Sequence, residues 1–252
     1  MGGGVRTTPG PAYATGGIVA LLIAAALTSW LCSPLDASAG GAMILSLGDD
    51  SYIPWSEVEG RTGAVVSRGF GTSPLSDFSV LVLSNVSYGA LPEALRDGLR
   101  DYLARGGSML VTGGNRSYGS GGYAGTDLAA LLPFRPARED FGYHPYGPTY
   151  IVQPGHPILK EVTIPTMAFF NELELNIGTV EIAQYIRARR LPWPLIAERI
   201  SSAGTVLALA LDMNLTGDWK DRDRFAQNCV EYLLRRSQIP TPRSRAGSGP
   251  GG

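Results

Sequence analysis

Side chains that serve as nucleophiles, bases and metal ligands are scarce in this sequence, which has 252 residues but only two cysteines and two histidines. Cys32 and Cys229 form no CxxC or other metal-ligand spacing, and two cysteines make no disulfide framework. His144 and His156 are isolated, so no zinc-binding spacing is present. Cys229 falls in a helical pattern, where we expect a buried and unreactive thiol.

An excess of charge of one sign is also missing. The formal net charge is −1, and charged residues make up 17% of the chain against 44% hydrophobic residues. This balance predicts a packed core and gives no electrostatic footprint for nucleic acid, so we expect no nucleic-acid partner. We also expect no cofactor. The 33 glycines and 18 prolines predict many turns.

The N-terminal 40 residues contain a charge-free apolar segment, 18–32, followed by small residues at Ala37 and Ala39. This pattern predicts a signal peptide or a short membrane anchor over 1–40, and hence an exported or membrane-anchored, extracytoplasmic protein. The alternative is a buried N-terminal helix. Residues 237–252 are rich in Pro, Gly, Ser and Arg, so we expect a disordered tail after a domain over 41–236.

Between these ends, the chain shows short apolar runs and helical patterns. Apolar runs at 42–47, 78–83 and 108–112 predict strands, and the spacing of Leu95, Leu99 and Tyr102 predicts a helix over 92–104. Strand, helix and strand in this order indicate a βαβ unit with parallel strands. We predict further strands over 149–152, 167–170, 193–200 and 205–211, and a closing helix over 222–235.

These elements predict one α/β domain with a doubly wound, mostly parallel sheet and helices on both faces. The short region between Val58 and Phe78 suggests that the first βα unit is trimmed. Ligands of such sheets bind beyond the carboxyl ends of the strands. Those ends fall here at 48–50, 84–86, 113–117 and 212–214.

The glycine-rich stretch 113–134 follows one of these strands. A Walker phosphate loop needs a lysine, and the stretch has none. Its GxGxxG-like letters at 119–124 begin too far after the strand for a dinucleotide-binding turn. Ser117 stands close to a GxSxG nucleophile motif, with His156 as the base and Asp212 or Glu172 as the orienting carboxylate. Alternatively, Ser117 only bonds backbone groups.

The segment 212–223 echoes a calcium-binding loop, although Lys220 and the weak ligand Thr216 depart from the pattern. Alternatively, Asp221 or Asp223 caps the last helix. The candidate metal ligands are Asp212, Asn214, Asp218 and Asp223.

The order of strand, GGNRSYGSGGYAGT and an apolar run ending LLPF resembles the glutamine amidotransferase-like family, which has the class I amidotransferase fold. His156-Pro157-Ile158 and the run from Gly204 to Asp212 support the resemblance by their order, and it covers most of 41–236. The resemblance implies a flavodoxin-like fold of three layers. The HPI motif ahead of Asn171-Glu172 is more weakly similar to trehalose-utilisation-like proteins.

Active members of this family carry a cysteine after the central strand and a downstream His-x-Glu. Residues 113–117 contain no cysteine, and His144 and His156 are each followed by proline. We therefore expect a non-catalytic domain that binds a small polar ligand or other envelope proteins. The alternatives are a hydrolase of amides or glycans that uses Ser117 or a carboxylate, and a calcium-binding module. The expected ligand-binding residues are Asp49, Asn85, Gly113, Gly114, Asn115, Ser117 and Tyr118.

Overall fold

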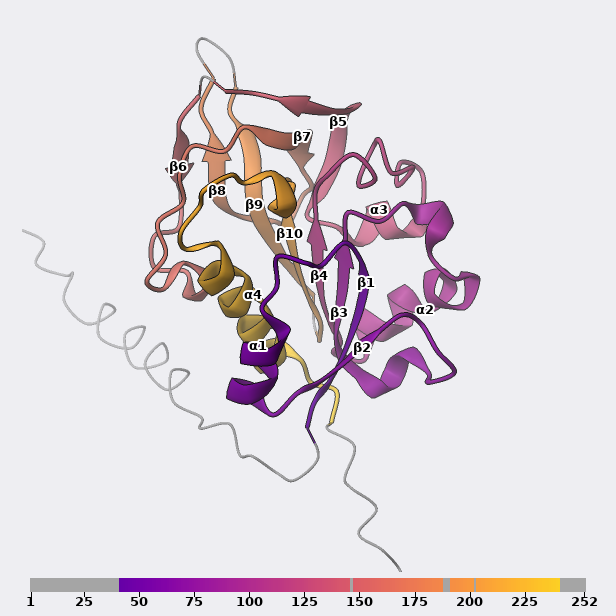
Figure 1. The fold of residues 1–252 in the computed structure, drawn as a ribbon. Coiled ribbons are helices and arrows are strands. Elements are labelled where there is room, and N and C mark those ends of the chain that lie inside the picture. Colours follow the sequence, from indigo (N-terminus) through magenta and orange to yellow (C-terminus); the bar gives the residue numbers. More distant parts are fainter. Residues whose placement is uncertain (1–40, 146, 188–190, 202, 241–252) are drawn as a thin grey trace, which may run out of the picture. The chain divides into compact units, whose positions relative to one another are not determined.

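A large mixed β-sheet forms the centre of the protein, with helices packed on both of its faces (Figure 1). The computed structural model describes residues 41–145, 147–187, 191–201 and 203–240, without the side chains of 137–140. These residues belong to one compact unit, Ala37–Gly252. The predicted N-terminal segment 1–40 and all of the predicted tail beyond residue 240 lie outside the described residues.

Five parallel strands make up one half of the sheet. Their order is β2-β1-β3-β4-β10, so the chain places β3 beside β1 rather than beside β2. Every residue of β3, β4 and β10 is buried, as expected for strands covered on both faces. The bounds are β1 Met43–Gly48, β2 Val65–Arg68, β3 Phe78–Ser84, β4 Ser108–Thr112 and β10 Thr205–Leu209.

The other half of the sheet is antiparallel and consists of β9 (Trp193–Ile200), β8 (Val180–Tyr185) and β6 (Thr149–Ile151). Only a short loop joins β9 to β10, and Ser201 and Gly204 bond to each other across it. A parallel connection needs a crossover of a dozen or more residues, so this loop forces an antiparallel pair. The sheet is therefore mixed, which corrects the prediction of a mostly parallel sheet.

Helices α1 (Trp55–Thr62) and α4 (Arg222–Arg236) lie on one face of the sheet, and α2 (Glu93–Ala104) and α3 (Asp127–Leu131) lie on the other (Figure 1). The region between Val58 and Phe78, which was expected to be too short for a full first βα unit, contains most of α1 and all of β2, so this unit is present. Single turns of 3-10 helix connect the larger elements. They are η1 Leu75–Asp77, η2 Tyr88–Ala90, η3 Pro157–Leu159 and η4 Met213–Leu215.

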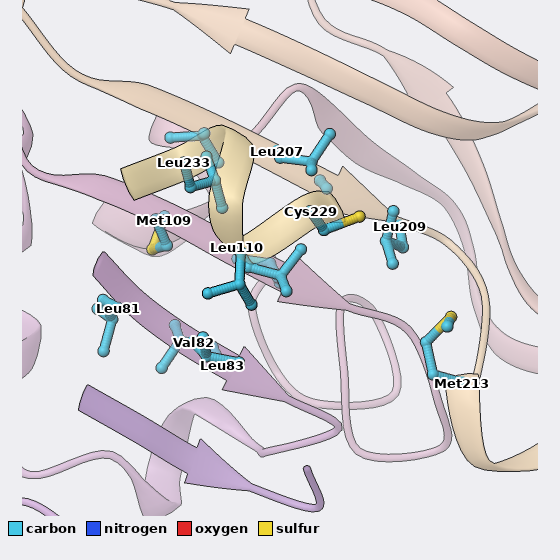
Figure 2. Packing of buried hydrophobic residues seen from close by; sticks show 14 of the residues in the cluster. Leu81, Val82, Leu83, Met109, Leu110, Leu207, Leu209, Met213, Cys229 and Leu233 are labelled. Atoms are coloured by element: carbon cyan, nitrogen blue, oxygen red, sulfur yellow. The ribbon is translucent and has the colours of Figure 1, made fainter. Parts of the chain in front are cut away.

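The core lies between the central strands and α4. Side chains of β3, β4 and β10 meet Cys229 and Leu233 of α4 in one buried cluster (Figure 2). Cys229 is fully buried, and burial raises the pKa of its thiol well above the usual range. This confirms the prediction that the thiol is buried. On the other face, the predicted apolar stripe of α2 is buried at Leu95, Leu99 and Tyr102.

A separate two-stranded ribbon, β5 (Phe134–Tyr143) and β7 (Phe169–Leu175), lies beyond the carboxyl ends of β4 and β10 (Figure 1). Phe170 of β7 forms an antiparallel bridge with Leu211, where the chain continues past β10. The ribbon is thereby tied to the carboxyl edge of the main sheet. Among the described residues, no helix has the length and apolar character needed to cross a membrane.

Candidate functional site

Polar side chains from different loops meet beyond the carboxyl ends of the parallel strands. Asp49 follows β1, and Asn214 follows β10. The Ser51 hydroxyl donates to the Asp49 carboxylate at 3.1 Å and to the Asn214 side-chain oxygen at 3.0 Å. The Asn214 side-chain amide donates to the Asp49 carbonyl oxygen at 3.3 Å. These contacts join the ends of β1 and β10, which are distant in the sequence.

A second group of polar side chains lies at the ends of β3 and β4. The Asn85 side-chain amide donates to Asn115 at 3.3 Å, and its side-chain oxygen accepts from the Arg116 backbone N–H at 2.9 Å. Asn85 has a φ of 44°, a left-handed conformation that asparagine tolerates better than most residues. Asn115 and Arg116 are exposed, so this group presents an amide and a guanidinium to solvent.

Hydroxyl groups connect the two halves of the edge. The Ser84 hydroxyl donates to the Asp49 carbonyl oxygen at 2.5 Å and lies 3.1 Å from the Thr112 hydroxyl. Beside them, Gly114 has a φ of 136°, and a Cβ at this position would lie 2.3 Å from the Asn85 side chain. The close approach of the β4 loop to Asn85 therefore requires glycine at position 114.

Asn171 of β7 anchors this glycine loop. Its side-chain oxygen accepts from the Gly114 N–H at 2.8 Å, and its side-chain amide donates to the Gly114 carbonyl at 3.1 Å. Asn171 is only 2% exposed, so both bonds are shielded from water. The side chain satisfies both backbone groups of Gly114 and fixes the ribbon against the end of β4.

Asp212 is the most perturbed carboxylate at this edge. It is 5% exposed, and its side chain accepts from the Asn214 N–H at 3.0 Å. Burial raises the pKa of Asp212, the backbone bond from Asn214 opposes the shift, and the nearby negative charge of Asp49 adds to it. The positive charge of Arg116 is too weak to cancel the increase. Burial first, and then the charge of Asp49, therefore disfavour the ionised form of Asp212.

Two residues of the predicted site do not present their side chains there. Ser117 is fully buried, and its hydroxyl donates to the Thr112 carbonyl at 2.7 Å. Tyr118 is also fully buried, and its hydroxyl donates to the Leu209 carbonyl at 2.8 Å. Gly113 and Gly114 contribute only backbone. Of the seven predicted binding residues, Asp49 and Asn115 therefore remain as side chains that a ligand can reach, while Asn85 is buried and positions Asn115 and the Arg116 backbone.

His156 lies in a different cluster, between the sheet and α4. Its Nε2 lies 3.4 Å from a Glu198 carboxylate oxygen, and the Tyr232 hydroxyl donates to the other oxygen at 2.6 Å. Burial alone would raise the pKa of Glu198, but the bonds from His156 and Tyr232 outweigh it and lower the pKa. Since Ser117 bonds to backbone and His156 to Glu198, the structure does not assemble the predicted Ser-His pair.

Glu172 lies on β7 next to Asn171 but points to the opposite face of the ribbon, as adjacent strand residues do. Its carboxylate lies 3.9 Å from Nε2 of His144. The His144 ring packs against Phe170 and Trp193, with ring centroids 4.4 Å and 4.8 Å away. Glu172 therefore does not orient His156, and it belongs to an aromatic region behind the edge site.

The calcium-loop residues are dispersed. Asp223 lies in the first turn of α4 and bonds Arg222, whereas Asp218 lines a surface hollow beside Trp219. Within the described ranges, no group of three or more His, Cys, Asp or Glu side chains could hold a metal ion. Asp221 stands at the helix N-cap, yet its carboxylate accepts from the Thr163 N–H instead of capping the helix.

Sequence reasoning missed Ser51, Arg116 and Asn171 as parts of the edge. Ser51 and Arg116 directly follow predicted residues, so proximity along the chain could have identified them. Asn171 bonds a glycine 57 positions away, and no local pattern indicates that contact.

Comparisons with known proteins bear on the fold. No family model matches the chain, and no curated protein matches it. A cytoplasmic protein from Salmonella typhimurium is similar in structure with a TM-score of 0.61 at 17% identity, covering 78% of this chain and 99% of that chain. A second, from Salmonella typhimurium LT2, gives 0.60 at 18% identity, covering 78% and 100%.

A protein from Bacteroides uniformis described as ThuA-like has a TM-score of 0.54 at 12% identity, covering 84% of this chain and 99% of that chain. This likeness fits the weaker predicted similarity, to trehalose-utilisation-like proteins, at the level of fold. At such identities the likeness shows the fold alone.

The comparisons also correct the predicted location. Export and membrane anchoring were inferred from 1–40, which lie outside the described residues. The two Salmonella structures are described as cytoplasmic proteins, and no helix of the described ranges could span a membrane. We therefore withdraw the prediction of a transmembrane, extracytoplasmic envelope protein.

Proposed function

We propose that this domain binds a small polar ligand at the carboxyl ends of β1, β3, β4 and β10 and does not hydrolyse glutamine. One observation carries the proposal. Asp49, Asn85, Asn115 and Asn214 come from four separate loops and converge on one edge through hydrogen bonds that link neighbouring loops. Groups held this way keep fixed positions before a ligand arrives, which lowers the entropy cost of binding.

The strand order supports this location. Counting β10 as the fifth parallel strand, β2-β1-β3-β4-β10 reads 2-1-3-4-5, the order of flavodoxin-like sheets. We infer a flavodoxin-like fold related to class I amidotransferase-like domains. In that order the switch point lies between β1 and β3, where ligands bind. Asp49 follows β1 and Asn85 follows β3, so both stand at the switch point.

The placement of Ser117 supports a binding role over catalysis through this residue. Its hydroxyl is buried and bonded to backbone, and His156 is held by Glu198 on the α4 side. Neither group can approach a substrate at the strand ends without breaking these contacts.

A second candidate function is hydrolysis by a pair of carboxylates. Asp212 has a raised pKa beside the charge of Asp49, and such a pair can divide the roles of acid and base. A panel of amide and glycoside substrates, assayed with the wild-type protein and with Asp212→Asn, decides between the two functions. Turnover that is lost in the variant would favour hydrolysis.

The binding proposal is tested by thermal-shift screening with amino acids, polyols, nucleobases and nucleosides. A ligand of the edge should raise Tm in the wild-type protein. Asp49→Asn and Asn115→Ala should each weaken its binding about tenfold, because the first replaces a charged acceptor with an amide and the second removes an amide.

The matched control is Asp127→Asn. Asp127 pairs with Arg100 on the exposed surface of α3, away from the strand ends. If every ligand found binds Asp49→Asn and Asn115→Ala as tightly as Asp127→Asn, the edge is not the site and the proposal fails.

A further inference from the structure

Aromatic side chains on the β5–β7 ribbon form a row that ends beside the polar groups at the carboxyl ends of the parallel strands. Tyr143 lies directly opposite Phe169 in the ribbon. On the other side of β7, the Asp212 N–H donates to the Phe169 carbonyl at 3.2 Å, next to the bridge between Phe170 and Leu211. Residues opposite each other on antiparallel strands point to the same face. Tyr143, Phe169 and Asp212 therefore form one row across three strand segments.

The rings of this row are not part of the core. The Phe169 ring lies 4.8 Å from the Tyr143 ring and 6.3 Å from the Phe141 ring, measured between centroids. Tyr143 is 62% exposed, and Phe141 and Phe169 are only half-buried. Aromatic side chains that cluster at a surface without entering the core offer flat apolar faces for stacking.

The same face of the ribbon carries Asn171, which lies opposite Phe141 and bonds Gly114 at the end of β4. The aromatic row and the polar edge therefore border each other. A ligand held by Asp212 and Asn115 would extend over Phe169 toward Tyr143.

The hydrogen-bonding chemistry of the polar groups further limits the classes of ligand that would fit. The Asp212 carboxylate accepts hydrogen bonds, and the exposed Asn115 amide uses its oxygen to accept from Asn85 and has its nitrogen as a donor. Asparagine amides and carboxylates match the donor and acceptor edges of nucleobases. The carboxylates of Asp49 and Asp212 already repel each other here, so the negative charge of a phosphate would meet further repulsion.

The geometry points to a flat heteroaromatic ring with an amino group, carried without phosphate, as the ligand class of this edge: a free nucleobase or a nucleoside. The ring stacks on Tyr143 and Phe169, and its amino group donates to Asp212. This inference rests on the proposed function and names the ligand of the same site.

Calorimetric titration with adenosine tests the inference. Adenosine should bind the wild-type protein, and adenosine monophosphate should bind at least about tenfold more weakly because of the carboxylates. Tyr143→Ala should weaken adenosine binding about tenfold through the lost stacking. Tyr143→Phe keeps the ring and is the matched control, so its affinity should equal that of the wild-type protein.

The outcomes separate the two proposals. If adenosine, adenine, cytidine and cytosine all fail to bind while an amino acid or polyol binds in an Asp49-dependent manner, the ligand class is wrong and the proposed function stands. Adenosine binding that Tyr143→Ala leaves unchanged also overturns the ligand class. If no compound of either kind binds in an Asp49-dependent manner, both proposals fail.

Discussion

Two carboxylates of this domain are equally buried and yet respond to their surroundings in opposite ways. Asp212 and Glu198 are each 5% exposed. The pKa of Asp212 is raised, whereas the pKa of Glu198 is lowered. Both lose hydration, but Glu198 accepts bonds from His156 and Tyr232, while Asp212 faces another carboxylate.

This difference distinguishes the structural cluster around Glu198 from the candidate ligand-binding site around Asp212. The Glu198 cluster is complete because both carboxylate oxygens have partners from different elements, and it holds η3 and α4 to the sheet. At the edge, burial and the charge of Asp49 both disfavour the ionised Asp212 carboxylate, which a ligand with hydrogen-bond donors would stabilise. Substitutions in the two regions should therefore differ in what they change.

The largest expected effect is the loss of stability in Glu198→Ala. Removing this carboxylate leaves the buried His156 and Tyr232 without their partner, which should lower the free energy of unfolding by about 3 kcal/mol. Urea denaturation measures the change. Ligand binding at the edge should stay the same.

The matched control is Glu174→Ala, which removes an exposed partner of Arg135. Exposed ion pairs contribute little, so this change should cost less than about 1 kcal/mol. Equal costs for the two substitutions would show that the Glu198 cluster is not a structural clamp.

The cluster also predicts a pH dependence. The folded-state pKa of Glu198 lies below its unfolded value, so its contribution to stability is complete above the unfolded pKa and is lost as pH falls through the folded pKa. In urea titrations at acidic pH, the difference between wild-type protein and Glu198→Gln should shrink. A difference that stays constant through this range would contradict the assignment.

Asn171→Ala should have the next largest effect and should act on both stability and binding. It leaves the N–H and the carbonyl of Gly114 without partners in a buried place, at a cost of about 2 kcal/mol. Asn176→Ala is the control, because Asn176 bonds a single backbone carbonyl from a half-buried position. If the two variants unfold at the same urea concentration, Asn171 does not anchor the loop.

Much of the fold could be predicted from the sequence. The predicted bounds agree with the observed ones for two strands, 78–83 (β3) and 108–112 (β4), and for two helices, 92–104 (α2) and 222–235 (α4). Apolar periodicity predicts such elements because it follows from their burial. The antiparallel half of the sheet was not predicted, because its decisive feature is the short connection between β9 and β10 and not the apolar pattern of the strands. α1 was missed because it has only eight residues and few apolar ones.

The site was harder to predict than the fold. Strand ends indicated that Asp49, Asn85 and Asn115 lie near one another, because the carboxyl ends of parallel strands share one edge. That these residues bind a ligand stays a prediction. The sequence left the role of Ser117 open between a nucleophile and a residue that bonds backbone. Its burial could not be predicted because it depends on the path of the glycine loop, which Asn171 holds through a contact between remote segments. The amidotransferase-like interpretation of this stretch stays a proposal.

Asp212→Asn should change the free energy of unfolding less than Glu198→Ala does, and in the opposite direction. The folded-state pKa of Asp212 lies above the unfolded value, so its contribution to stability is complete below the unfolded pKa and is lost as pH rises through the folded pKa. A neutral asparagine avoids this loss and still accepts from Asn214. At neutral pH the variant should be more stable, by less than about 1 kcal/mol after solvent screening, while losing ligand affinity.

Ser51→Ala should change stability least and tests whether the edge is preorganised. Ser51 is exposed, so its loss should shift the free energy of unfolding by less than about 0.5 kcal/mol. The hydroxyl nevertheless holds Asp49 and Asn214 together, and without it both side chains gain freedom that binding must remove. Calorimetry should show that the variant binds the ligand with several-fold lower affinity and a less favourable binding entropy than the wild-type protein does. An unchanged affinity would mean that the edge adapts to its ligand instead of being positioned for it.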